Sequence, residues 1–176
     1  MKPISEQEHR ILSVLEHEGK IPTVPYDITE EHLIAFMHAY VNILNKKPFA
    51  LDTSDYRYSR KLAGLSLVKH NIKMGKTPSE IKSGFVYLIE NKAYPEHFKV
   101  GMCVDVEDRL KTYQTYDPYR SFKVNRYEFV LNRRHYEKLI LSSYHLSLEE
   151  GEWIKKSNAE RIFRDVTFVY DKVYAK

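Results

Sequence analysis

The sequence predicts an α+β protein in which a helical N-terminal region precedes a small three-stranded antiparallel sheet flanked by helices. Three observations predict this class. Apolar residues recur at helical spacing through much of residues 1–82, strand-like runs begin at Gly84, and helical spacing returns after the second run. We therefore divide the chain into a helical N-terminal region, 1–82, and a second domain, 83–176.

The first two helices of the N-terminal region have recognisable ends. Residues 5–8, Ser-Glu-Gln-Glu, have the form of a capping box, and Gly19 is placed to end the first helix. Thr29 can cap a second apolar-periodic run that continues until Pro48. Residues 52–58 are interpreted as a loop after that run.

A third helix is expected over 60–74, and it lies in a strongly basic segment. Residues 56–76 contain no acidic side chain. Such a segment could follow a phosphate backbone, although a solvated helix face is the alternative. The candidate nucleic-acid-binding residues are Arg57, Arg60, Lys61, Lys69 and Lys73, with Lys111 and Arg120 from the second domain.

The second domain opens with a predicted β-hairpin. Residues 84–89, Gly-Phe-Val-Tyr-Leu-Ile, are rich in strand formers, and Phe-Lys-Val-Gly follows at 98–101 after a break that contains Asn91 and Pro95. We expect strands over 84–90, 97–101 and 122–130, and helices near 104–115, 133–146 and 157–172.

The hairpin strands and the two helices that follow them each carry a polar residue that is a candidate for a functional site. Tyr87 and Lys99 lie on the two hairpin strands, while Arg109 and Tyr113 lie one helical turn apart on the next helix, whose Arg109 would point back over the hairpin. Glu137 is the only carboxylate of the 133–144 helical run. Taken singly, each has a structural interpretation: a packed tyrosine ring, an outward lysine, or a solvated arginine or glutamate.

Their joint order resembles the GIY-YIG nuclease superfamily over about residues 84–165. A glycine and a tyrosine stand on the first strand and a glycine ends the second; an arginine follows eight residues later and a glutamate lies on a later helix. The similarity is closest to the phage-rich branch whose second motif is Lys-Ile-Gly. The matching segments are Lys99-Val100-Gly101 and Glu152-Trp153-Ile154. An extra residue separates Gly84 from Tyr87.

The resemblance implies a Mg²⁺- or Mn²⁺-dependent endonuclease that hydrolyses phosphodiester bonds of DNA, of phage or mobile-element type. It implies Glu137 as the metal ligand, Arg109 as the phosphate-binding group and Lys99, assisted by Tyr87, as the group that activates water. Tyr113, one helical turn after Arg109, could donate to the phosphate or to the metal-bound water. The alternatives are a catalytically inactive nucleic-acid-binding or host-interaction protein of this fold, and a virion component with a vestigial site.

The role of the N-terminal helices stays open. Residues 62–66, Leu-Ala-Gly-Leu-Ser, have some character of a helix-turn-helix element that would grip DNA. Packing of these helices on the catalytic sheet, completing its core, is the alternative that we favour.

Aromatic residues offer two further alternatives. Tyr113, Tyr116 and Tyr119 lie among the basic residues Lys111, Arg120 and Lys123. They could form an edge that stacks on bases and contacts phosphates, or the apolar cover of a small domain, which we favour. Trp153 is expected to anchor the core rather than to stack on a base.

Composition limits the partners. Lysine and arginine total 28 against 24 acidic residues, which permits DNA binding, and the single Cys103 excludes an internal disulfide. No zinc-site spacing, signal peptide or membrane-length apolar run is present. We expect a cytoplasmic protein, in the host cell if phage-encoded, with no membrane partner and no small-molecule cofactor. A two-strand cut by one such site would imply a homodimer.

Overall fold

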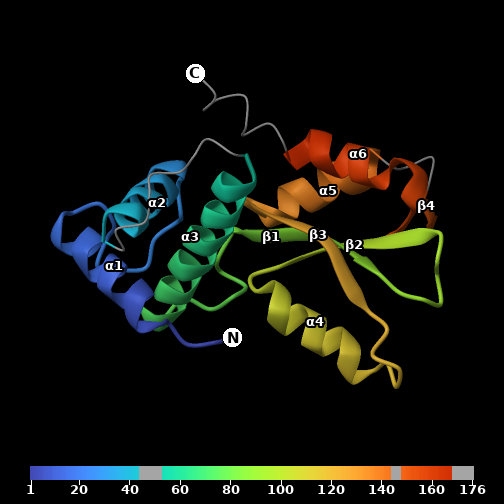
Figure 1. Ribbon diagram of the computed structural model, residues 1–176, viewed down its shortest axis with the longest axis horizontal. Helices are drawn as coiled ribbons and strands as arrows, with labels where there is room; N and C mark the ends of the chain where they lie inside the picture. The colour runs from blue at the N-terminus through green and yellow to red at the C-terminus, as the bar shows by residue number, and fades with distance from the viewer. Residues whose placement is uncertain (44–52, 144–147, 168–176) are drawn as a thin grey trace. The chain divides into compact units, whose positions relative to one another are not determined.

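The computed structural model describes residues 1–43, 53–143 and 148–167 (Figure 1). The chain forms two compact units, Met1–Gly84 and Phe85–Lys176. The first is helical and the second combines helices with a sheet, so the predicted α+β class is confirmed. Within the described residues, every helix is too short or too polar to span a lipid bilayer.

Three helices form the N-terminal unit, as predicted. The capping box at the start of the first is present: Glu8 N donates to Ser5 Oγ at 3.2 Å, and Ser5 N donates to Glu8 Oε2 at 2.7 Å. Gly19, with φ +67°, follows the end of that helix. The helices are α1 (Glu6–His17), α2 (Glu30–Ile43) and α3 (Thr53–Lys73).

The loop predicted over 52–58 is wrong, because α3 begins at Thr53. Its first residues are Thr, Ser and Asp, types that favour helix N-termini as much as loops, so composition alone does not separate the two. The predicted continuation of the second helix from residue 44 to Pro48 lies outside the described residues.

The N-terminal unit has its own apolar core and buried polar contacts. Leu12, Leu33 and Leu67, one from each helix, are fully buried. Glu8 joins α1 to α3, because its carboxylate accepts a hydrogen bond from Ser66 Oγ at 2.6 Å. Unpaired buried carboxylates are costly, so such contacts fix how the helices pack.

The second unit holds a five-stranded sheet in the order β3-β1-β2-β5-β4. Pairings β1–β2, β2–β5 and β4–β5 are antiparallel. In Figure 1, α5 and α6 cover one face of this sheet and α4 lies on the other. The elements are β1 (Gly84–Glu90), β2 (His97–Cys103), α4 (Val106–Thr115), β3 (Lys123–Val130), α5 (Arg133–Ser143), β4 (Leu148–Glu150), β5 (Trp153–Lys155) and α6 (Lys156–Thr167).

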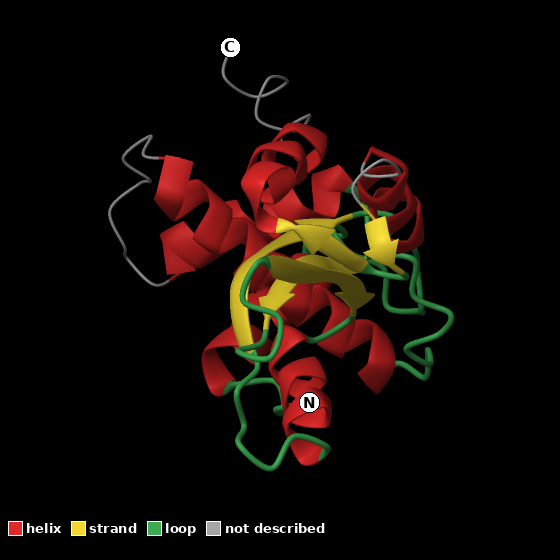
Figure 2. Cartoon of the chain, turned by 90° about the vertical axis from the view of Figure 1, so that its right-hand side faces the viewer, coloured by secondary structure: helices red, strands yellow, loops and turns green. Residues whose placement is uncertain are grey.

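The three predicted strands are present, but the predicted strand count is too low. Strands β4 and β5 have three residues each and are joined by a turn at Gly151, whose φ is +60°. Three residues are too few to show the period-2 alternation that marks a strand, so the sequence pattern did not reveal them. Figure 2 shows the strands of the sheet from the side, in yellow.

The register assigns alternate residues to opposite faces of the sheet. Leu88 pairs with Val100, and Phe98 of β2 pairs with Ile154 of β5. These side chains belong to one buried cluster with Ile140 of α5 and Phe163 of α6. The neighbouring positions on each strand therefore face α4, and they include the polar residues singled out above.

Candidate active site

The ring of Tyr87 lies directly across Gly101, its cross-strand partner. A Cβ atom at position 101 would lie 2.3 Å from Tyr87 Oη and 2.4 Å from Cζ, closer than real Cβ contacts come. Only glycine leaves room for the ring at this place. The glycine that ends the second motif thus seats the tyrosine of the first.

The hydroxyl of Tyr87 holds two residues of α4. Tyr87 Oη lies 3.1 Å from Tyr113 Oη and accepts a hydrogen bond from Arg109 Nε at 3.2 Å. The Arg109 guanidinium carbon also lies 5.0 Å from the centroid of the Tyr113 ring. Arg109 therefore points back over the hairpin, as its helical position predicts.

Local sequence places α4 for these contacts. Asp105 is the N-cap and accepts hydrogen bonds from the backbone N–H groups of Glu107 at 2.9 Å and Asp108 at 3.3 Å. The four-residue spacing puts Arg109 and Tyr113 on one face of the helix. Tyr113 is further fixed because its ring stacks on Phe122 with centroids 5.1 Å apart.

The surroundings of Tyr87 favour the protonated form of its phenol. Burial, and then the Tyr113 hydroxyl, raise the pKa of Tyr87 above its ordinary value. The raised pKa favours the protonated phenol, and a role of Tyr87 in activating water stays a prediction. The Tyr87 hydroxyl in turn raises the pKa of Arg109, so the guanidinium keeps its positive charge.

Lys99 stands on the same face of the sheet as Tyr87. Its Nζ forms an ion pair with Glu152 Oε2 at 3.1 Å. The same Nζ lies 5.9 Å from the centroid of the Tyr113 ring and 5.7 Å from that of Trp153. A carboxylate and two rings thus hold the amine beside the Tyr87–Arg109–Tyr113 cluster.

Two residues of the Glu-Trp-Ile segment belong to this face, which the sequence did not indicate. Trp153 pairs with Lys99 across β2 and β5, while its neighbour Ile154 enters the core. The expectation that Trp153 anchors the core is therefore wrong. Glu152 was not predicted as a site residue, because its contact with Lys99 depends on the pairing of the short strand β5.

Glu137, on α5, is influenced by charged residues of this cluster. Burial raises the pKa of its carboxyl group, the negative charge of Glu152 raises it further, and the positive charges of Arg109 and Arg133 oppose both effects. These influences place the carboxylate in the electrostatic field of Glu152 and Arg109. The structure thus brings Tyr87, Lys99, Arg109 and Tyr113 into a contact cluster, with Glu137 close enough to sense its charges.

The donor set suits a hard divalent cation. The negative charge of Glu152 raises the pKa of Glu137, and both side chains can supply the carboxylate oxygens that Mg²⁺ prefers as ligands. Mg²⁺ keeps several waters and needs only one or two protein carboxylates. Among the described residues, no group of three or more His, Cys, Asp or Glu side chains could hold a metal ion. The residues present fit hydrated Mg²⁺ and do not fit an all-protein metal cage.

The predicted basic residues separate into two groups. Arg60 is only 5% exposed and forms a two-bonded pair with Glu30, and Lys69 pairs with Glu8 at 3.4 Å. We do not retain these two as phosphate contacts, because acidic partners from α2 and α1 already neutralise them. Arg57 and Lys61 are partly exposed, and the exposed ones are Lys73, Lys111 and Arg120.

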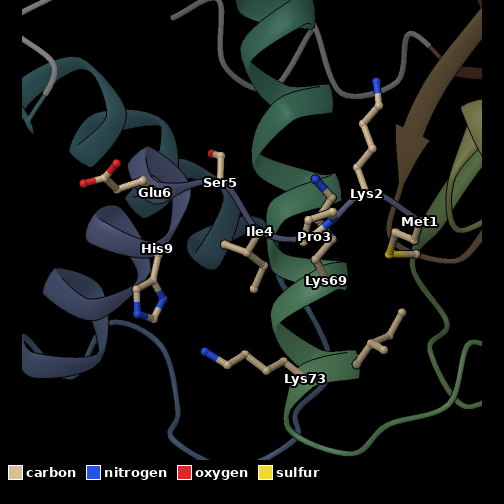
Figure 3. A pocket seen from close by; sticks show the side chains of 10 residues that line it. Met1, Lys2, Pro3, Ile4, Ser5, Glu6, His9, Lys69 and Lys73 are labelled. Carbon is tan, nitrogen blue, oxygen red and sulfur yellow. The ribbon is translucent and has the colours of Figure 1, made fainter.

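A cavity of about 570 Å³ lies in the N-terminal unit (Figure 3). Residues 1–6, His9 and three residues of α3 line it, with Lys69 and Lys73 among the latter. None of the five predicted catalytic residues takes part in it.

The segment that carries the candidate site matches a known protein family. The family model of the T5orf172 domain, a phage-associated domain of the GIY-YIG-related group, matches residues 84–166. Comparisons with curated proteins and with solved structures found no match. The matched segment is just under half of the chain and contains all five predicted catalytic residues. Over this segment the chain is similar to a phage-related, nuclease-like domain.

Proposed function

We propose that the protein is a metal-dependent endonuclease that hydrolyses phosphodiester bonds of DNA. One observation carries the proposal: the charged Arg109 is fixed by the hydroxyl of Tyr87, whose ring packs on Gly101. Lys99 lies beside Tyr113 of the same cluster, and the charge of Arg109 acts on the half-buried Glu137. The similarity of residues 84–166 to a nuclease-like domain supports the same reaction class.

Arg109 is the phosphate-binding group of this proposal. Its Nε donates to Tyr87, which orients the guanidinium and leaves its terminal nitrogens for two parallel hydrogen bonds to phosphoryl oxygens. Such charge-assisted bonds strengthen as negative charge develops on those oxygens in the transition state. Tyr113 shares the hydroxyl contact of Tyr87 and can donate to the same phosphate.

Lys99 is the proposed proton acceptor. In the hydrolysis, a water oxygen forms a new bond to phosphorus while the bond from phosphorus to the departing sugar oxygen breaks. The Lys99 ammonium group first gives its own proton to solvent. The neutral amine then takes the proton of the attacking water, and the departing oxygen takes a proton from solvent. Glu152, 3.1 Å from Lys99 Nζ, holds the amine in position.

Glu137 would hold the metal ion, with Glu152 as the neighbouring carboxylate. Mg²⁺ at this place would supply positive charge that stabilises the phosphoryl oxygens. The raised pKa of Glu137 gives a test that does not depend on activity, because a bound cation favours the ionised carboxylate. Mg²⁺ is expected to raise the unfolding temperature of the wild type and to leave that of Glu137→Gln unchanged.

Cleavage of supercoiled plasmid with Mg²⁺ tests the reaction. Arg109→Ala and Glu137→Gln are expected to lower the cutting rate by about 100-fold or more, because each removes a group that stabilises the transition state. Arg161→Ala and Glu160→Gln, exposed positions on α6, are the matched controls and should cut normally.

Two results would contradict the proposal. Cutting that survives both site substitutions would assign the activity to another site or to a contaminant. A wild-type protein that binds DNA without cutting it in Mg²⁺ or Mn²⁺ would favour the inactive nucleic-acid-binding alternative.

A further inference from the structure

Three tyrosine rings stand out from the second unit into solvent. Tyr94 is 52% exposed, Tyr116 86% and Tyr119 89%. We call these three residues the aromatic rim. Among the described residues of this unit, Leu139 is the one other large apolar side chain with comparable exposure. The idea that Tyr116 and Tyr119 cover the core is therefore wrong, and grouped exposed rings are typical of a binding surface.

The residues of the rim lie in two loops that are joined by a hydrogen bond. Tyr94 lies in the loop between β1 and β2, and Tyr116 and Tyr119 lie in the segment between α4 and β3. Asn91 of the first loop donates from Nδ2 to Asp117 Oδ2 of the second at 3.4 Å. Both loops lie at the same end of the sheet in Figure 1.

Asp117 also fixes the backbone of its own loop. Its carboxylate accepts hydrogen bonds from Tyr119 N at 3.0 Å, Ser121 N at 2.7 Å and Ser121 Oγ at 2.5 Å. In the other loop, Asn91 Oδ1 accepts from Ala93 N at 2.8 Å. The exposed rings therefore stand on ordered turns, which lowers the entropy lost when a partner packs on them.

The rim continues into the candidate active site. The Tyr94 ring packs on Trp153 with centroids 4.6 Å apart, and the Trp153 ring lies 5.7 Å from Lys99 Nζ. On the other side, Tyr116 follows Tyr113 at the end of α4. Three exposed basic residues lie in or next to the same two loops: Lys92, Arg120 and Lys123.

We propose that the aromatic rim binds unpaired nucleotides, so that the substrate is DNA with a single-stranded segment next to the cut. Exposed rings with positive charges beside them match a strand of free bases on a phosphate backbone, because any unpaired base can stack on a ring and lysine or arginine neutralises the phosphates. The bases of an intact duplex already stack on one another and offer no such face. This inference deepens the proposed nuclease function and rests on it for the position of the cut.

Binding of fluorescein-labelled oligo-dT to the full chain in EDTA tests the rim without any cutting. Trp153 is the only tryptophan of the chain and packs on Tyr94, so its fluorescence reports stacking at the rim directly. We expect oligo-dT to quench Trp153 and to bind more tightly than a duplex of the same length. Increasing salt should weaken both complexes.

The variants separate ring stacking from other effects. Tyr94→Ala, Tyr116→Ala and Tyr119→Ala should each weaken oligo-dT binding by about 5- to 100-fold and leave duplex binding unchanged, whereas phenylalanine at the same positions should bind nearly normally. Tyr58→Ala removes a ring of 65% exposure on α3 and is the matched control, with no change expected.

Equal affinity for oligo-dT and duplex, or alanine variants that bind oligo-dT like the wild type, would overturn the inference. Because binding is measured in EDTA, an inactive protein that still prefers oligo-dT would contradict the proposed nuclease alone. A protein that cuts plasmid but shows no such preference would contradict the rim alone.

Discussion

Replacing Gly101 with alanine tests the packing on which the candidate site depends. The added methyl group would lie 2.3 Å from Tyr87 Oη and 2.4 Å from Cζ. Ordinary contacts of this kind are above 3.4 Å, so the fully buried ring must move by about 1 Å or more. A ring displaced that far loses its hydroxyl contacts with Arg109 and Tyr113.

The expected cost follows from these two effects. Forcing an extra methyl group into a packed core costs about 1–3 kcal/mol. Loss of two hydrogen bonds at a buried hydroxyl adds about 1 kcal/mol each. Gly101→Ala should therefore lower the free energy of unfolding by roughly 3–5 kcal/mol in total, and it should also abolish cutting because Arg109 is no longer oriented.

Urea unfolding of the full chain, followed by circular dichroism, measures this cost. Gly151→Ala is the control: its φ of +60° disfavours alanine, but nothing lies within 4 Å of the new Cβ. It should cost only about 1 kcal/mol. In a Tyr87→Ala background, where the ring is absent, Gly101→Ala should cost far less than in the wild type.

A Gly101→Ala protein within about 0.5 kcal/mol of the wild type would refute this reasoning. Equal costs of the substitution with and without the Tyr87 ring would refute it as well. Either outcome would mean that the ring does not lie across Gly101.

Three further predictions concern single groups. Glu137→Gln should raise the unfolding temperature near pH 7, because the raised pKa of Glu137 means that its ionised form opposes folding. This gain should shrink as the pH falls toward the ordinary pKa range of a glutamate. Calorimetry at several pH values measures it, and a gain that is the same at every pH would contradict the prediction. Arg60→Ala should cost up to about 3 kcal/mol in urea unfolding, because the partly buried carboxylate of Glu30 loses the cation that neutralises it. Glu30→Ala in the same chain should restore part of the loss. Burial, and then Asp105, raise the pKa of Cys103 to about 12, so a thiol reagent at pH 8 should label it far more slowly in the native protein than in urea; equal rates would oppose this burial.

Local sequence patterns predicted the first elements of the second unit well. The hairpin strands carry runs of strand formers, and the helix after them carries an acidic N-cap with apolar residues at helical spacing. Because these elements follow one another along the chain, their geometry also predicted that Arg109 would point over the hairpin.

Contacts between distant segments could not be predicted. Glu152 meets Lys99 only because β5 adds to the edge of β2. Arg60 of α3 likewise pairs with Glu30 of α2, thirty positions away in the sequence. The basic segment 56–76 contains no acidic residue of its own, but acidic residues of another helix partly neutralise it in the folded chain. Exposure of Tyr116 and Tyr119 was equally hidden, since a tyrosine suits a core and a surface alike.

One face of β1 and β2 carries apolar core residues and the other carries polar site residues, and this difference fixes the register in which the two strands pair. Val100 enters the apolar core while its neighbour Lys99 faces Glu152 and Tyr113 on the other side of the sheet. A slip by one residue would exchange them, carrying an ammonium group into the hydrocarbon interior and Val100 into water. Misaligned hairpins are therefore strongly disfavoured, and the residues of the candidate site should assemble or disperse together with the fold.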